Sequence, residues 1–177
     1  MSSQNKPVEA FVAVGSNIAP REHIPKALDL LRTYVRVTSA STFYSTPSLG
    51  RPELPEYRNG VLKIETCHKP FTLKFDVMRP IEDKLGRVRS GDRYAPRTID
   101  LDVILYGEQV VDEEGLLIPD PGIWERPFVA VPLLELAPEL VIPGTGEPLA
   151  ELDSCKRRGE LRADEVLTQT MKERLRS

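Results

Sequence analysis

The segment Thr98–Leu105 reads TIDLDVIL, and it alternates apolar residues with aspartate over most of its length. A period of two is typical of a β-strand, because successive side chains point to opposite faces of a sheet. One face should meet a core beneath helices, and the other should carry both aspartates. The first set is Ile99, Leu101, Val103 and Leu105, and the second is Asp100, Asp102 and Ile104.

Segments on the N-terminal side of this strand alternate between strand and helix patterns. Predicted strands are Val8–Val14, Val35–Tyr44 and Tyr57–Thr66, with a loop over Ser45–Glu56, and predicted helices are Arg21–Tyr34 and Pro70–Leu85. Pro80 should kink or break the second helix, because proline lacks the N–H that a helix interior uses. The resulting order, βαββαβ, predicts an α+β fold of the ferredoxin-like type, an antiparallel sheet with helices on one face.

The chain beyond Gly107 is less regular. We expect a short hairpin, a loop over Ile118–Pro127, an apolar helix near Val131–Leu136 and a polar helix over Asp164–Arg176. One domain over residues 1–177 is predicted, with a core of about residues 8–143 and a C-terminal extension over 144–177. We expect the terminal helix over Asp164–Arg176 to matter least for catalysis.

The composition is that of an ordinary globular chain, with 177 residues, 40% hydrophobic residues and a net charge of −3. The negative charge gives no general attraction to nucleic acid or to an anionic membrane, so we expect neither as a partner. Cys67 and Cys155 match no metal-binding or disulfide spacing. The polar N-terminus does not resemble a signal peptide, and no apolar run approaches the roughly 18 residues of a membrane span. A cytoplasmic protein is predicted.

Asp100 and Asp102 share one face of a strand, about 7 Å apart at the usual rise per residue. Like charges this close repel unless something neutralises them. Mg²⁺ suits the position, because it binds one or two carboxylates and keeps its other ligands for water and phosphates. The alternative is a half-exposed strand that carries two solvated acids.

The preceding loop, Gly86–Arg97, reads GRVRSGDRYAPR and contains four arginines. Guanidinium groups match phosphate oxygens and stay charged. Placed directly before two strand aspartates, they combine anion clamps with a metal site, the two parts that phosphoryl transfer needs. A solvated basic loop remains the alternative, but the combination favours magnesium-dependent chemistry on ATP.

The whole stretch from Gly86 to Leu105 resembles the signature of the 6-hydroxymethyl-7,8-dihydropterin pyrophosphokinases of folate biosynthesis. Three further blocks are similar to the family in the same order: AVGSN at 13–17, FYSTPSLG at 43–50 followed by YRN at 57–59, and ERPFVAVPLLELAPEL at 125–140. The resemblance covers about Val8–Pro143.

This resemblance implies transfer of a pyrophosphoryl group from ATP to the pterin hydroxymethyl, with release of AMP. It implies that Asp100 and Asp102 hold two Mg²⁺ ions, with Asp102 placed to help activate the attacking hydroxyl. Together with Arg87 and Arg97 these form the implied catalytic set. Implied ATP-binding residues are Glu82, Arg87, Arg89, Arg97 and Arg126, and implied pterin-binding residues are Thr46, Pro47, Leu49, Tyr57, Asn59 and Phe128. ATP and the pterin are the expected partners of a monomer.

Two positions depart from the family pattern. Asp120 stands where the family usually has a histidine that contacts the ATP phosphates, and Tyr94 stands where a tryptophan is common. An anion beside a triphosphate is unfavourable unless it turns away or reaches a metal ion. Asp120 therefore receives no phosphate role, and either nucleotide affinity is weaker or Arg126 compensates. His23 and His68 match no family site.

Three other functions stay open at this point. An Asp-x-Asp strand also suits nucleotidyltransferases, which release pyrophosphate instead of AMP. The same fold hosts RNA-binding and regulatory modules, although the charge and the missing aromatic sheet motif count against RNA. A degenerate domain that binds pterin without turning over ATP is the third possibility, because of Asp120.

Overall fold

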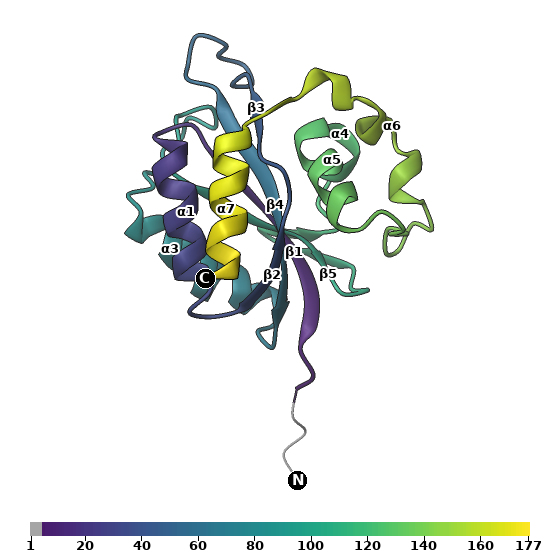
Figure 1. Ribbon diagram of the computed structural model, residues 1–177. Coiled ribbons are helices and arrows are strands. Elements are labelled where there is room, and N and C mark those ends of the chain that lie inside the picture. The colour runs from purple at the N-terminus through teal and green to yellow at the C-terminus, as the bar shows by residue number, and fades with distance from the viewer. Residues whose placement is uncertain (1–4) are drawn as a thin grey trace.

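The computed structural model describes residues 5–177, which form a six-stranded antiparallel sheet with helices on both sides (Figure 1). The strand order is β5-β1-β4-β3-β8, and β2 also pairs with β4. The strands are β1 (Val8–Ser16), β2 (Arg36–Ala40), β3 (Tyr44–Thr46), β4 (Tyr57–Thr66), β5 (Asp100–Tyr106) and β8 (Arg162–Ala163). With β1 between β4 and β5, the predicted ferredoxin-like α+β fold is confirmed.

The first predicted helix is α1 (Pro20–Leu31), and the second is a run of three segments. These are α2 (Pro70–Thr72), the π-helical segment η1 (Leu73–Met78) and α3 (Arg79–Lys84). Pro80 lies at the start of α3. The kink or break that we expected at Pro80 is therefore a π-helical turn just before it. At the start of α3 the N–H that proline lacks would have no helical partner.

The helices cover both faces of the sheet, which corrects the expectation of a single covered face. α1, α3 and α7 (Glu165–Arg176) lie on one side, and α4 (Gly122–Glu125), α5 (Pro127–Leu136) and α6 (Asp153–Lys156) lie on the other (Figure 1). The predicted hairpin is β6 (Val111–Glu113) and β7 (Leu116–Ile118), and short 3₁₀ turns occupy Leu149–Glu151 and Arg158–Glu160.

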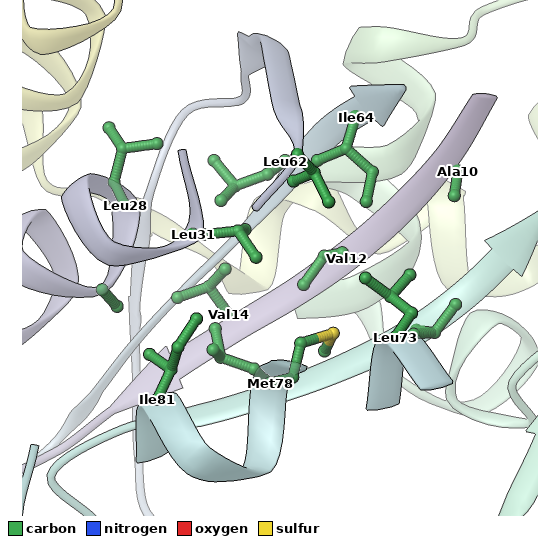
Figure 2. Packing of buried hydrophobic residues seen from close by; sticks show 14 of the residues in the cluster. Ala10, Val12, Val14, Leu28, Leu31, Leu62, Ile64, Leu73, Met78 and Ile81 are labelled. Carbon is green, nitrogen blue, oxygen red and sulfur yellow. The ribbon is translucent and has the colours of Figure 1, made fainter. Parts of the chain in front are cut away.

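Each face has its own apolar core. Figure 2 shows the first core, in which Val12 and Val14 of β1 meet Leu31 of α1 and Met78 of η1. The second core lies under α5 and contains Phe11, Ile104 and Leu133. Strand β1 contributes apolar side chains to both cores, because neighbouring residues of a strand point to opposite faces of the sheet.

The predicted alternation of β5 is correct as far as Val103 and wrong for Leu105. The pairing with β1 shifts register between Phe11 and Val12, so that Val12 faces Val103 and Phe11 faces Leu105. Ile104 is the extra residue of this bulge, and it joins Leu105 in the second core. The strand also begins at Asp100, two residues later than predicted.

The single strand predicted over Val35–Tyr44 is instead β2 and β3, separated by three residues. In this gap, the Ser41 backbone N–H donates to Val61 O at 2.9 Å and its hydroxyl accepts from Val61 N–H at 2.8 Å. The side chain thus replaces a ladder bond and lets the chain bend. As a result Thr46 ends β3, although the sequence predicted it in a loop.

The C-terminal extension packs against the core. β8 pairs with β3, and Leu167 and Met171 of α7 are buried in the first core. Asp164 caps α7 by accepting from the Leu167 N–H at 3.0 Å. Its carboxylate also accepts from Arg21 at 3.0 Å and from Arg58 at 2.8 Å. Within residues 5–177, no helix is long and apolar enough to cross a lipid bilayer.

Candidate active site

A pocket of about 250 Å³ opens on the α5 side of the sheet, where β1 ends and β4 and β5 begin. All six residues that the resemblance assigns to the pterin line it, namely Thr46, Pro47, Leu49, Tyr57, Asn59 and Phe128. It is also lined by four of the predicted charged residues, Arg97, Asp100, Asp102 and Arg126. The ferredoxin-like core therefore brings two distant sets of predicted residues into one concave site.

Strand register explains why these residues meet. Gly15 of β1 lies between Asn59 of β4 and Asp100 of β5, and Ala13 lies beside Asp102. Residues that pair across adjacent strands share a face, so the amide and both carboxylates project to the same side. The Asn59 amide donates to Thr46 Oγ1 at 2.9 Å, which fixes its orientation.

Asp100 is held between two arginines. Its Oδ1 accepts from Arg87 Nη1 at 3.0 Å, and its Oδ2 accepts from Arg97 Nη1 at 2.7 Å. Arg87 Nη1 also donates to the Ile99 carbonyl at 2.9 Å, and only 11% of the Arg87 side-chain surface is exposed. Both guanidinium groups are thus held beside the carboxylate pair before any ligand arrives.

Asp102 has a weaker partner. Its nearest cation is Lys74 of η1, with 3.6 Å between Nζ and Oδ1. Although 41% of the Asp102 side-chain surface is accessible from the pocket, burial of the carboxylate and then the negative charge of Asp100 raise the pKa of Asp102 above its usual range. A divalent cation at this position would relieve that repulsion.

The oxygen ligands that Asp100 and Asp102 offer are of the kind that Mg²⁺ binds. Both ligands are hard oxygen atoms on one rigid strand, and they repel each other until a cation arrives. Among residues 5–177, no group of three or more His, Cys, Asp or Glu side chains could hold a metal ion. An ion at Asp100 and Asp102 would therefore complete its shell with water and phosphate oxygens, as Mg²⁺ does.

Glu82, Arg87 and Arg89 do not line the pocket. The Glu82 carboxylate accepts from the Leu101 N–H at 2.8 Å and pairs with Arg87 at 3.5 Å. Arg89 pairs with Glu82 and with Asp83. Burial raises the pKa of Glu82, while the bond from Leu101 opposes that shift. Glu82 thus lies between β5 and the arginine loop and holds both arginines.

Asp120 turns toward its own backbone. Its Oδ1 accepts from the Gly122 N–H at 2.7 Å, and its own N–H donates to the Ile104 carbonyl at 3.0 Å. This side-chain turn starts α4 within the segment that the sequence predicted as loop. Burial raises the pKa of Asp120, and the nearby Arg126 and Lys74 oppose that rise. Arg126 itself reaches the pocket, with its guanidinium 5.9 Å from the Phe128 ring.

Arg93 and Tyr94 also line the pocket. The sequence indicated Arg93 only as one of the four loop arginines and Tyr94 only as a departure from the family pattern. Their loop touches the 47–56 loop, since Arg51 pairs with Asp92 at 2.6 Å. The Tyr94 ring packs on Gly50, where an added Cβ would lie only 3.0 Å from it. The place of Tyr94 in the arginine-rich loop pointed to the site, but no pattern in the sequence linked this residue to Gly50.

The chain is similar to known proteins over most of its length. The profile of the 7,8-dihydro-6-hydroxymethylpterin-pyrophosphokinase (HPPK) family matches residues 11–138. The chain belongs to the HPPK family. Its strands β1 to β5 and helix α5 all fall mainly within that match, whereas β8 and α7 lie beyond it.

Individual relatives agree with this assignment. Over 145 residues, the chain is 41% identical to the 2-amino-4-hydroxy-6-hydroxymethyldihydropteridine pyrophosphokinase of Pseudomonas aeruginosa, covering 80% of this chain and 88% of the relative. The protein of the same name from Haemophilus influenzae is 39% identical over 141 residues, covering 78% and 87%. The Schizosaccharomyces pombe folic acid synthesis protein fol1 is 40% identical over 162 residues, but these make up 22% of that longer protein and 89% of this chain.

Proposed function

We propose that this chain transfers the pyrophosphoryl group of Mg²⁺-bound ATP to the hydroxymethyl group of 6-hydroxymethyl-7,8-dihydropterin, giving the pterin diphosphate and AMP in folate biosynthesis. The HPPK family and the names of its relatives give the pyrophosphokinase activity and its pterin acceptor. One observation carries the assignment to this site. The carboxylates of Asp100 and Asp102 line the same pocket as Tyr57 and Asn59.

The pterin subsite is proposed at the uncharged end of the pocket. Tyr57 and Phe128 offer two aromatic rings for a flat heteroaromatic ring system. Asn59 can donate and accept in the plane of such a ring, and its bond to Thr46 leaves Oδ1 free to accept. Pro47 and Leu49 supply apolar contact from the loop after β3.

The triphosphate subsite is proposed at the charged end. Asp100 and Asp102 would hold two Mg²⁺ ions, which would neutralise the negative charge of the phosphates. Arg97 and Arg126 line the pocket and are assigned to phosphate oxygens. Arg87 is assigned to the same anion from behind Asp100, and Glu82 positions both Arg87 and Arg89.

The proton of the attacking hydroxyl is assigned to Asp102. Its carboxylate lines the pocket and, apart from the loose pair with Lys74, forms no ion pair with the residues described, so it is the less engaged acceptor of the two. Asp100, in contrast, already accepts from Arg87 and Arg97. Positioning and charge neutralisation then account for most of the rate, as is usual in phosphoryl transfer.

Exclusion of water is assigned to the two loops beside the pocket. The contacts between Arg51 and Asp92 and between Gly50 and Tyr94 join these loops beside the pocket that Tyr94 lines. A closed site favours transfer to the pterin over hydrolysis of ATP. We also propose that residues 1–177 act as one domain and a monomer on small molecules, with no nucleic-acid partner, in keeping with the net charge of −3.

The test is a product analysis. The purified chain is incubated with ATP, Mg²⁺ and 6-hydroxymethyl-7,8-dihydropterin, and the nucleotides and pterins are separated by chromatography. AMP and pterin diphosphate in equal amounts, and neither without Mg²⁺, support the proposal. Release of pyrophosphate instead would indicate a nucleotidyltransferase. Pterin binding without AMP would indicate a degenerate binding domain, and Asp120→His would then be the first variant to make.

A further inference from the structure

A lysine that no sequence pattern indicated lies beside the carboxylate pair. Lys74 Nζ is 3.6 Å from Asp102 Oδ1. This separation exceeds the roughly 2.7–3.2 Å of an N–H···O hydrogen bond, so the two charges attract each other without forming one. The Lys74 ammonium donates no hydrogen bond to any group in residues 5–177, so its three N–H donors are available to a ligand.

The position of Lys74 is fixed by its neighbours. It lies in η1 directly after Leu73, which is fully buried in the first core near Val12 (Figure 2). The Lys74 side chain is only 23% exposed, and its ammonium lies 5.8 Å from the Phe75 ring centre. The ammonium is therefore held beside Asp102 instead of extending freely into solvent.

The two carboxylates differ in how firmly their cations hold them. Asp100 accepts hydrogen bonds from two guanidinium groups, whereas Lys74 is the sole ion-pair partner of Asp102 among the residues described. A metal ion bound to Asp102 would take over the charge that now attracts the ammonium. Lys74 would then need another anion within reach, and a polyphosphate oxygen is the anion that the reaction brings there.

Asp120 lies close enough to Lys74 to feel its charge, but it does not pair with this lysine. Its carboxylate is engaged by the Gly122 N–H, and no ion pair between Lys74 and Asp120 forms within 4 Å in the described part of the chain. Arg126 lines the pocket; Lys74 does not, but its ammonium lies 3.6 Å from the carboxylate of Asp102, which does. Lys74 and Arg126 therefore remain available to bind phosphate, because the Asp120 carboxylate is bonded to the backbone of Gly122.

We propose that Lys74 donates to a phosphate oxygen of the nucleotide once Asp102 holds a metal ion, which adds a nucleotide-binding residue to the arginines already assigned. This inference rests on the proposed function, because it needs Mg²⁺ and a polyphosphate at this site. On this proposal, Lys74 contacts the nucleotide when metal is bound, and it pairs with Asp102 when no ligand is bound.

The test measures binding without turnover. Calorimetry follows α,β-methylene-ATP with Mg²⁺, an analogue whose bridge between the first two phosphorus atoms cannot be broken by pyrophosphoryl transfer. Lys74→Met keeps the apolar stem and should weaken binding about tenfold, whereas Lys74→Arg keeps the charge and should lose less. Lys84→Met is the matched control, since Lys84 is exposed at the end of α3 and should bind as the wild type does. Pterin binding without nucleotide should be equal in all four proteins.

The outcomes distinguish the role of Lys74 from the proposed function on which it rests. Equal analogue affinity in Lys74→Met and the wild type would overturn the role of Lys74. So would tighter Mg²⁺ binding in Lys74→Met with unchanged analogue affinity, because Lys74 would then be only a counter-ion of Asp102. Failure of the wild type to bind the analogue would instead overturn the proposed function, and the inference with it.

Discussion

Gly15 lies between Asn59 and Asp100 in the sheet, and a methyl group added to Gly15 would come within 2.7 Å of the Asn59 Oδ1. A separation below about 3 Å requires one of the two groups to move. The missing side chain at Gly15 therefore lets the proposed pterin-binding amide and the proposed metal-binding carboxylate share one face of the sheet at close range.

Gly15→Ala should displace the Asn59 amide and weaken pterin binding about tenfold, the cost of roughly one well-placed hydrogen bond. The loss of stability should be small, because the amide can rotate toward the open pocket. A titration of the pterin with the purified variant checks this. Gly159→Ala is the control, because a Cβ at Gly159 meets nothing within 4 Å. Unchanged pterin affinity in Gly15→Ala would remove Asn59 from the subsite.

Asp100→Asn and Asp102→Asn should both lower turnover by about a hundredfold or more, because loss of a metal ligand removes several kcal/mol of charge stabilisation. Their effects on stability should differ. Asp100→Asn leaves the nearly buried Arg87 without the closer of its two carboxylate partners, at a cost of about 1–3 kcal/mol of unfolding free energy. Asp102→Asn removes a carboxylate whose ionisation is disfavoured by burial and then by Asp100, so the metal-free protein should keep or gain stability.

Two measurements check this pair, a steady-state assay and urea unfolding in a chelator. Turnover above about a tenth of the wild-type rate in both variants would contradict the metal assignment. Equal loss of stability in both would contradict the difference between the two ion-pair environments.

Asp164 should make folding stability depend on acid pH. Burial disfavours its charge, but hydrogen bonds from Arg21, the Leu167 N–H and Arg58 outweigh this and lower the pKa of Asp164 to about 2. Because this lies below the value of about 3.9 in an unfolded chain, the contribution is complete above about pH 4. It is lost as the pH falls through about 2, and amounts to roughly 2–3 kcal/mol.

Urea unfolding from pH 5 to pH 2 tests this contribution. The wild type should lose about 2–3 kcal/mol more over this range than Asp164→Asn, which has no carboxylate to protonate. Asp153→Asn is the control, because 97% of the Asp153 side chain is exposed. Parallel curves for Asp164→Asn and the wild type would show that the docking of α7 does not depend on this charge.

The contact between Arg51 and Asp92 should have a modest, salt-dependent effect on substrate retention. Both side chains are partly exposed, at 42% and 36%, so the pair is worth at most about 1 kcal/mol. Arg51→Ala should raise the KM for the pterin by up to about fivefold at low salt, and the difference should vanish near 0.5 M salt. Arg36→Ala breaks an exposed pair with Glu65, far from the pocket, and should leave KM unchanged. A salt-independent effect of Arg51→Ala would exclude this pair as the cause.

The sequence by itself determined the order of elements and the chemistry of the site. Periods of two and of 3.6 are local signals, so the strands and helices could be predicted from their own residues. The same holds for the four arginines and the two aspartates, because they lie within 16 consecutive residues. Closeness in the chain made the combination visible in the sequence, although Arg87 and Arg89 do not line the pocket in the folded chain.

Only the tertiary structure decided the strand registers and the side-chain orientations that depend on distant segments. The bulge that moves Leu105 to the other core arises from pairing with β1. The turn of Asp120 toward Gly122 and the approach of Lys74 to Asp102 depend on how α4 and η1 pack against β5. Asp164 became a buried cap through arginines more than 100 positions away in the sequence. In each case the free energy comes from contacts between segments that no local pattern brings together.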